Sequence, residues 1–176
     1  MKKVLVVIDM QKDFVDGALG TAEAVAIVDN VVKEMKKDYD VVYLTKDTHQ
    51  VNYLETQEGR NLPVVHCVEN TDGWQFDRKV EKAYKKLNNA IVFNKPTFGS
   101  EKLAEEIKKL AETYGIESIT LVGLCTDICV VSNALLIKAA VPEIEIRCLA
   151  DCCAGVTPAS HTAALETMKM CQIKVM

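Results

Sequence analysis

The sequence predicts an α/β fold: a three-layer α/β/α sandwich, doubly wound around a parallel sheet of about six strands. Two observations lead to this prediction. Six short apolar runs rich in β-branched residues recur along the 176 residues, and such runs are typical of parallel strands buried on both faces. Segments with helical spacing lie between most of these runs, and this alternation is typical of a doubly wound sheet without an internal linker. We therefore expect a single domain over residues 1–176.

The predicted strands follow directly from the aliphatic runs. They cover residues 4–8, 41–44, 90–93, 118–122, 144–148 and 173–175. In an open α/β sheet, ligands bind beyond the carboxyl ends of the strands. The residues that follow these runs are therefore the first places to look for a functional site.

Four helices are predicted from apolar spacing and capping residues. They cover residues 21–37, 101–114, 127–140 and 159–170. The second has Ser100 as a good N-cap and Gly115 as its stop. Its charged residues at 101–109 predict a solvated face rather than a binding patch. Residues 46–77 have no clear periodicity, and loops of this length in compact domains are usually functional.

Composition excludes several classes of protein. Lys and Arg number 21 against 25 Asp and Glu, and this net charge of −4 argues against nucleic acid or an anionic membrane as a partner. The apolar run after Lys3 stops at Asp9, too early for a signal peptide, and no run approaches the roughly 18 residues of a membrane span. We expect a cytoplasmic protein that forms a homo-oligomer.

The cysteines argue for a reducing compartment. There are seven of them, an odd number, in a chain long enough to build a hydrophobic core, so a disulfide framework is not expected. Five are interpreted as core or strand-end residues: Cys67, Cys148, Cys152, Cys153 and Cys171.

Cys129 is the candidate nucleophile. It follows the fourth predicted strand and opens a predicted helix. In the first turn of a helix, the positive end of the dipole favours the thiolate, and backbone N–H groups can receive an oxyanion. The alternative is a buried core cysteine, because the neighbouring Ile128 and Val130 are apolar.

Asp9 and Lys95 favour the catalytic interpretation. Asp9 follows the first predicted strand, and Lys95 follows the third. At adjacent strand ends they would lie beside Cys129, so the three residues would supply a proton acceptor, a fixed positive charge and a nucleophile. Each residue alone would be ordinary, since Asp is common in turns and Lys is commonly solvated.

Three segments resemble the motifs of the isochorismatase-like cysteine hydrolases. They read Asp-Met-Gln-Lys-Asp-Phe at 9–14, Lys-Pro-Thr-Phe-Gly-Ser at 95–100 and Val-Gly-Leu-Cys-Thr-Asp-Ile-Cys-Val at 122–130. They stand in the family's order and span nearly the whole chain. The resemblance implies that Asp9, Lys95 and Cys129 form a catalytic triad. It also implies that the backbone amides of Cys125 and Cys129 hold the oxyanion, with a cis peptide bond after Leu124. A cysteine at 129 points to the amide-cleaving branch, in which nicotinamidases are best known, rather than to true isochorismatases.

The long loop resembles the metal site of nicotinamidases. Asp47, His49 and His66 match its carboxylate and two histidines, and Glu58 stands where some members use a glutamate as a further ligand. Such a set suits a divalent ion, Zn²⁺ before Mn²⁺ or Fe²⁺, and leaves positions open for water or substrate. The alternative is that His49 and His66 are unrelated loop residues. The remaining histidine, His161, is expected to be a surface or capping residue.

The resemblance also implies a small planar amide as substrate, with nicotinamide hydrolysed to nicotinate and ammonia through a thioester on Cys129. Phe14 and Phe98 match aromatic positions of the family and, with Leu124, are the candidate substrate contacts. The aromatic residue that nicotinamidases often carry just before the metal-binding histidine is missing, and Leu62-Pro63-Val64-Val65 stands there. This departure affects the substrate's identity more than the type of reaction.

Other classes of function stay open. A relative that cleaves a carbamoyl or ureido amide would share the triad without needing a metal. A thiol- or metal-responsive binding module would use Cys125 and Cys129 as a pair, but it leaves Asp9 and Lys95 unexplained. A nucleotide-binding Rossmann domain is disfavoured, because the first strand is not followed by Gly-x-Gly-x-x-Gly.

Overall fold

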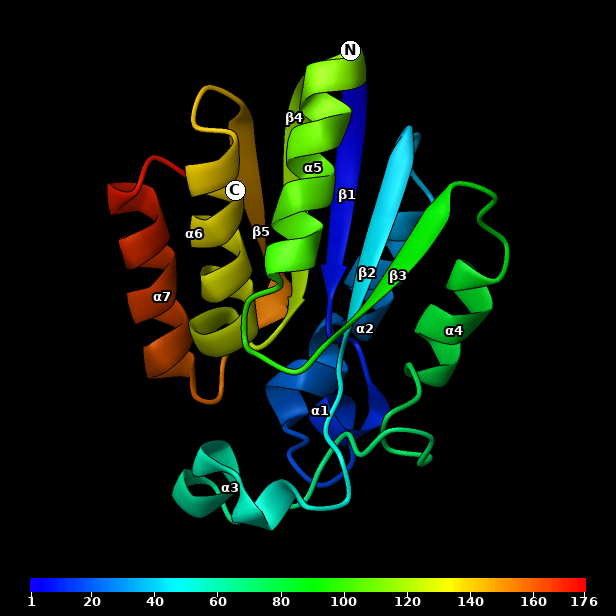
Figure 1. Cartoon of the computed structure of the whole chain (residues 1–176), viewed down its shortest axis with the longest axis vertical. Helices are drawn as coiled ribbons and strands as arrows, with labels where there is room; N and C mark the ends of the chain where they lie inside the picture. The colour runs from blue at the N-terminus through cyan, green and yellow to red at the C-terminus, as the bar shows by residue number, and fades with distance from the viewer.

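A single six-stranded sheet forms the middle layer of the computed structural model, which describes residues 1–176 (Figure 1). The strands lie in the order β3-β2-β1-β4-β5-β6, and every neighbouring pair is parallel. Their bounds are β1 Lys2–Ile8, β2 Val41–Asp47, β3 Ala90–Lys95, β4 Ile116–Leu124, β5 Glu145–Ala154 and β6 Lys174–Val175. The chain winds outward from β1 in both directions, which confirms the predicted doubly wound fold.

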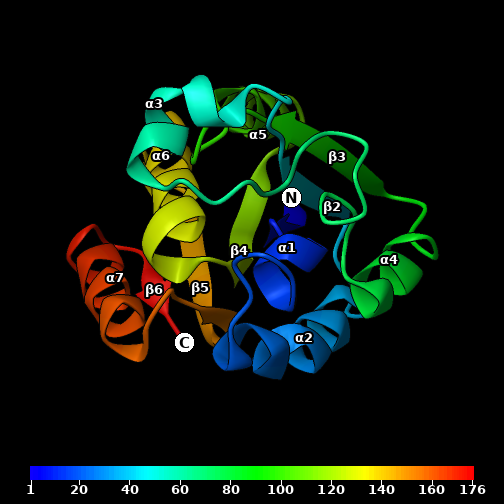
Figure 2. The same cartoon turned by 90° about the horizontal axis from the view of Figure 1, so that it is seen from below.

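Seven α-helices connect the strands. They are α1 Lys12–Val15, α2 Ala22–Met35, α3 Gln57–Asn61, α4 Arg78–Tyr84, α5 Glu101–Tyr114, α6 Val131–Ala140 and α7 Pro158–Met170, with a 3₁₀ turn at Tyr53–Glu55 and a π turn at Thr126–Val130. Seen from below, α2 and α4 lie on one side of the sheet, and α5, α6 and α7 lie on the other (Figure 2). The short helices α1 and α3 lie beyond the end at which β1 finishes (Figure 1). None of the helices combines the length and apolar character that crossing a membrane requires.

The run of aliphatics in β1 is explained by its central position. Leu5 and Val7 pack into the cluster that includes α2 and α4, whereas Val4, Val6 and Ile8 pack into the cluster that includes α5 and α6. All five side chains are fully buried. Burying each such side chain stabilises the fold by about 1.5–3 kcal/mol, so a strand buried on both faces needs no polar alternation.

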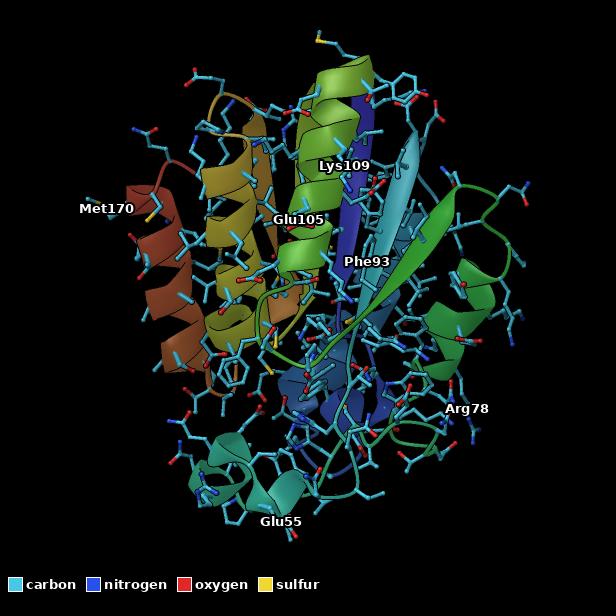
Figure 3. All side chains as sticks on the ribbon, in the orientation of Figure 1. Glu55, Arg78, Phe93, Glu105, Lys109 and Met170 are labelled. Carbon is cyan, nitrogen blue, oxygen red and sulfur yellow. The ribbon has the colours of Figure 1, made fainter.

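Helix α5 follows the boundaries predicted from its capping residues. The Ser100 hydroxyl accepts a hydrogen bond from the Leu103 N–H at 3.2 Å, and Gly115, with φ 71°, ends the helix. Glu105 and Lys109 lie on its exposed face (Figure 3). The predicted solvated face is therefore confirmed.

The structure differs from the prediction between β2 and β3. Part of the segment predicted as irregular forms the 3₁₀ turn and α3, and α4 follows it, although no helix was predicted there. Asp77 starts α4 by accepting the Lys79 N–H at 2.8 Å, and Val80 and Ala83 bury its inner face. Seven residues with only two buried apolar positions carry too weak a period to be recognised in the sequence.

Candidate active site

Asp9 lies directly after β1, at the carboxyl edge of the sheet. Its side chain is fully buried, and its backbone adopts φ 47°, a left-handed conformation that costs a non-glycine residue on the order of 1–3 kcal/mol. Its Oδ1 accepts a hydrogen bond from Thr45 Oγ1 at 2.6 Å, and its Oδ2 lies 2.7 Å from Lys95 Nζ. The carboxylate is therefore contacted on both oxygens, by a hydrogen bond on Oδ1 and by an ion pair on Oδ2.

Lys95 reaches this carboxylate from two strands away. It ends β3, which pairs with β2 rather than with β1, so the expectation that Asp9 and Lys95 stand at adjacent strand ends was wrong. The long side chain spans the end of β2, and Nζ lies 3.5 Å from Cys129 Sγ, 3.1 Å from Thr97 O and 3.6 Å from Asp47 Oδ1. With Asp9, the ammonium thus has four polar neighbours, while only 1% of Lys95 is exposed.

Cys129 lies in the π turn at the start of α6 and is buried. Burial raises the pKa of its thiol well above the usual range, and Asp9 adds to this rise while Lys95 opposes it. Removal from water therefore opposes the effect on the thiol that was expected from the helix start. Burial also raises the pKa of Asp9, against the effect of Lys95. The site therefore places a protonated thiol beside a carboxylate whose affinity for a proton is increased.

The turn before Cys129 contains the cis peptide bond that the resemblance implied, between Leu124 and Cys125. The Cys125 carbonyl accepts N–H groups from Ile128 and Val130 at 3.1 and 3.0 Å. Burial, followed by the nearby Asp127, raises the pKa of the Cys125 thiol to about 12. This thiol is therefore protonated at neutral pH.

His161, expected to be a surface or capping residue, is half-buried on α7 and makes a specific contact that the sequence did not indicate. Its Nδ1 lies 2.7 Å from the hydroxyl of Thr126, which is fully buried in the π turn. Thr126 follows Cys125 directly, so α7 is hydrogen-bonded to the turn that carries the nucleophile. Nothing in the local sequence distinguishes such a contact from a solvated histidine on the first turns of a helix.

Asp47, His49, Glu58 and His66 form the predicted cluster. One ligand atom from each lies within 4.8 Å of all the others. Asp47 Oδ2 is 2.9 Å from His49 Nε2 and 3.6 Å from His66 Nε2, and Glu58 Oε1 is 3.5 Å from His49 Nε2. His66 Nδ1 lies 2.7 Å from the Val64 carbonyl, which turns Nε2 toward the cluster.

The cluster has the chemistry of a divalent-ion site. His49 Nε2 is buried, and although Asp47 Oδ2 lies 2.9 Å away, the two groups do not have the geometry of a hydrogen bond. A buried polar group left unsatisfied costs about 1–3 kcal/mol. Burial alone would raise the pKa of Asp47, but His49, His66 and the Lys95 charge lower it overall, so this carboxylate is ionised. Two imidazoles and two carboxylates with one unsatisfied ring nitrogen fit Zn²⁺, Mn²⁺ or Fe²⁺.

Two further residues hold the cluster and were not recognised from the sequence. The Gln11 side chain accepts the Asp47 N–H at 2.7 Å and donates to the Asp47 carbonyl at 2.8 Å. The buried Tyr53 ring lies 4.6 Å from His49 and 5.0 Å from His66, between ring centroids. Gln11 stands inside the motif at 9–14, which was a usable signal, whereas a tyrosine in an irregular loop gives none.

One cavity of about 640 Å³ joins the nucleophile to this cluster. The predicted substrate contacts Phe14, Phe98 and Leu124 all line it. Phe14 is almost buried, with its ring centroid 5.5 Å from that of His66, whereas Phe98 is 46% exposed at the rim. The other residues that line the cavity include Cys125, Cys129, Asp47, Glu58 and His66. The cavity can therefore hold a flat ring between the thiol and the four-residue cluster.

Comparisons with known proteins agree over nearly the full length. A family model described as isochorismatase domain matches residues 3–176. The nicotinamidase/pyrazinamidase of Mycobacterium tuberculosis is 26% identical over 189 residues, covering 98% of this chain and 97% of its own. The solved nicotinamidase/pyrazinamidase PncA from Bacillus subtilis is similar with a TM-score of 0.82, at 26% identity and 99% coverage of both chains. The pyrazinamidase of Pyrococcus horikoshii in complex with zinc gives a TM-score of 0.79 at 28% identity, covering 100% of this chain and 99% of its own.

Proposed function

Because the chain belongs to the isochorismatase family, we propose that it is a metal-containing cysteine amidohydrolase that converts nicotinamide and water to nicotinate and ammonia. One observation carries this proposal. The Cys129 thiol, with Asp9 and Lys95 around it, opens into the same cavity as the cluster of Asp47, His49, Glu58 and His66. A hydrolase of carbamoyl or ureido amides would need the three catalytic residues, but not the cluster beside them.

The first half of the reaction is a proton transfer and an attack. Asp9 takes the proton of Cys129, and the sulfur attacks the amide carbonyl carbon. Lys95, at 2.7 Å from Asp9 and 3.5 Å from Cys129, stabilises the negative charge on whichever of the two carries it. The backbone amides of Cys125 and Cys129 hold the oxyanion, and removing one such donor typically costs about 10²–10³ in rate.

The second half releases both products. The proton on Asp9 passes to the amide nitrogen, ammonia leaves, and a thioester remains on Cys129. Asp9 then takes a proton from water, whose oxygen attacks the thioester carbonyl. The carboxylic acid leaves as the Cys129 thiol is restored, so that no oxidant or further reactant is needed.

The metal cluster accounts for binding of the ring. Asp47, His49, His66 and Glu58 would hold a divalent ion, which when bound supplies a Lewis-acidic partner for the pyridine nitrogen, directly or through water. The zinc in the pyrazinamidase of Pyrococcus horikoshii supports Zn²⁺ as the first candidate. Phe14 and Phe98 would flank the ring, and Leu124 would close the wall beside the thiol.

The deciding experiment measures ammonia release from nicotinamide, pyrazinamide and a panel of carbamoyl compounds. We expect the two aromatic amides to be hydrolysed and Cys129→Ala to be inactive. Undiminished release by Cys129→Ala would overturn the mechanism, and hydrolysis of carbamoyl compounds alone would overturn the substrate.

Metal analysis tests the other half of the proposal. We expect about one divalent ion per purified chain and loss of that ion in His66→Ala. A fully active wild type that contains no metal would refute the role of the cluster.

We further propose that the protein is cytoplasmic and assembles as a homo-oligomer. Seven free cysteines support a reducing compartment. Multi-angle light scattering tests the assembly, and a monomer at all concentrations would refute it.

A further inference from the structure

Asn133 is a fully buried polar residue on α6, one helical turn after Cys129. Both the nitrogen and the oxygen of its side-chain amide are hydrogen-bonded to main-chain groups. Nδ2 donates to the carbonyl of Cys129 at 2.8 Å and to that of Phe98 at 3.2 Å, and Oδ1 accepts the Ser100 N–H at 2.9 Å. One side chain therefore joins the backbone of the nucleophile to the loop between β3 and α5.

That loop carries two other parts of the site. Lys95 directly precedes it and donates through Nζ to the Thr97 carbonyl at 3.1 Å, and Phe98 forms part of the cavity wall. The loop also packs tightly on α6, because a Cβ added to Gly99 would lie 2.5 Å from Leu136 Cδ1. The position of the loop relative to Cys129 thus depends on this close packing against α6 and on the hydrogen bonds of Asn133.

We propose that Asn133 is a positioning residue that fixes the loop of Lys95 and Phe98 against Cys129, an inference that rests on the proposed function. The Lys95 Nζ to Cys129 Sγ distance of 3.5 Å is that of a direct hydrogen bond, through which the ammonium group can stabilise a forming thiolate. A shift of the loop lengthens it and also moves the ring-binding wall at Phe98. Asn133 therefore affects both the reactivity of the thiol and the binding of substrate without touching either the sulfur or the substrate.

Two substitutions separate these effects. Asn133→Asp keeps the side-chain shape but removes both donors, so a carboxylate oxygen faces the Cys129 and Phe98 carbonyls. Asn133→Thr keeps a single short donor, a hydroxyl that can bond to the carbonyl four residues earlier, at Cys129. It loses the hydrogen bonds to Phe98 and Ser100 in the loop. We expect kcat to fall roughly 10- to 100-fold in Asn133→Asp, the range typical of a displacement near 1 Å in an active site. In Asn133→Thr we expect partial rescue of kcat together with a raised KM.

Asn89→Asp is the matched control. Asn89 Nδ2 also donates to two carbonyls, those of Tyr39 and Asp40, at 2.8 and 3.2 Å, in the connection that precedes β3. This variant loses the same chemical group at a position outside the cavity. We expect it to change the melting temperature but not kcat or KM.

The measurements are kcat, KM, the melting temperature, and the rate at which iodoacetamide alkylates Cys129, followed by peptide mass spectrometry. We expect slower alkylation of Cys129 in Asn133→Asp than in wild type or Asn89→Asp. Alkylation needs no substrate, so it still decides the role of Asn133 if the wild type fails to hydrolyse nicotinamide and the proposed function falls. If Asn133→Asp does not fold, the split between kcat and KM in Asn133→Thr decides. Unchanged kcat, KM and alkylation in the folded variants, or losses that merely follow the melting temperature as in Asn89→Asp, would overturn the proposal.

Discussion

Replacing Thr45 with valine tests the role of Asp9 with the least disturbance of the core. Thr45 is fully buried in β2, and its hydroxyl donates to Asp9 Oδ1 at 2.6 Å. Valine has a similar volume but no hydroxyl, so the substitution removes a single hydrogen bond from the carboxylate. The hydroxyl also accepts the Asp9 N–H at 3.2 Å, but that N–H keeps the Thr45 carbonyl as an acceptor at 3.2 Å.

The size of the effect follows from the charge on the acceptor. A hydrogen bond to a charged group contributes about 1.5–3 kcal/mol. Since 1.36 kcal/mol corresponds to tenfold in rate, kcat/KM should fall by about 10- to 150-fold if the whole bond is needed in the transition state. Thr45→Ser keeps the hydroxyl and should retain most of the activity.

The pH dependence of kcat/KM should shift in a defined direction in Thr45→Val. The Thr45 hydroxyl favours the ionised carboxylate and so lowers the pKa of Asp9, against the larger effect of burial. Its loss raises that pKa further, and Asp9 accepts a proton only when it is ionised. The acidic limb of the kcat/KM profile should therefore move to higher pH in Thr45→Val.

Ammonia release between acidic and neutral pH measures this shift. Thr113→Val is the control, because the exposed Thr113 hydroxyl donates only to the Lys109 carbonyl of α5, at 2.8 Å. An unmoved acidic limb in Thr45→Val, with kcat/KM close to that of wild type, would mean that Asp9 is not the base.

Three further predictions concern other parts of the molecule. Cys125→Ala should keep most of the ammonia-releasing activity, because the backbone N–H is retained and a thiol with a pKa of about 12 takes no part at neutral pH. Gln11→Leu should bind metal roughly 10- to 100-fold more weakly, because it removes the two hydrogen bonds that hold the main chain of Asp47. Competition with a chelator measures this, and an unchanged metal affinity would show that Gln11 does not position Asp47. Thr157→Ala should lower the free energy of unfolding by about 0.5–2 kcal/mol in urea, since its hydroxyl caps α7 by accepting the Ser160 N–H, while leaving kcat unaltered; full stability would show that the cap contributes nothing.

Local signals were sufficient where they were strong. Ser100 and Gly115 marked both ends of α5, and the aliphatic run after Lys3 marked β1. They failed at α4, whose inner face is only Val80 and Ala83. A short helix is stabilised by packing against its neighbours more than by its own sequence pattern, and a local stretch of sequence does not reveal that packing.

The sequence indicated the candidate catalytic residues but not the residues that position them. Asp9, Lys95 and Cys129 stood out because each is a charged or nucleophilic side chain at the end of a buried strand or in the turn that follows it. Thr45 and Asn133 did not, since a hydroxyl within a strand or an amide within a helix has many ordinary uses. Their importance comes from partners that are 36 and 33–35 residues away in the chain.

The sequence by itself determined the class of fold, the order of its strands along the chain, and the candidate side chains for a nucleophile and a metal site. Only the tertiary structure decided that Lys95 spans the end of β2 to reach Asp9 and that His161 bonds the turn beside Cys125. It also decided that the resting Cys129 thiol keeps its proton. Distances across a sheet and the loss of water around a side chain arise only when remote segments pack together, so they set the electrostatics of the site without leaving a local pattern.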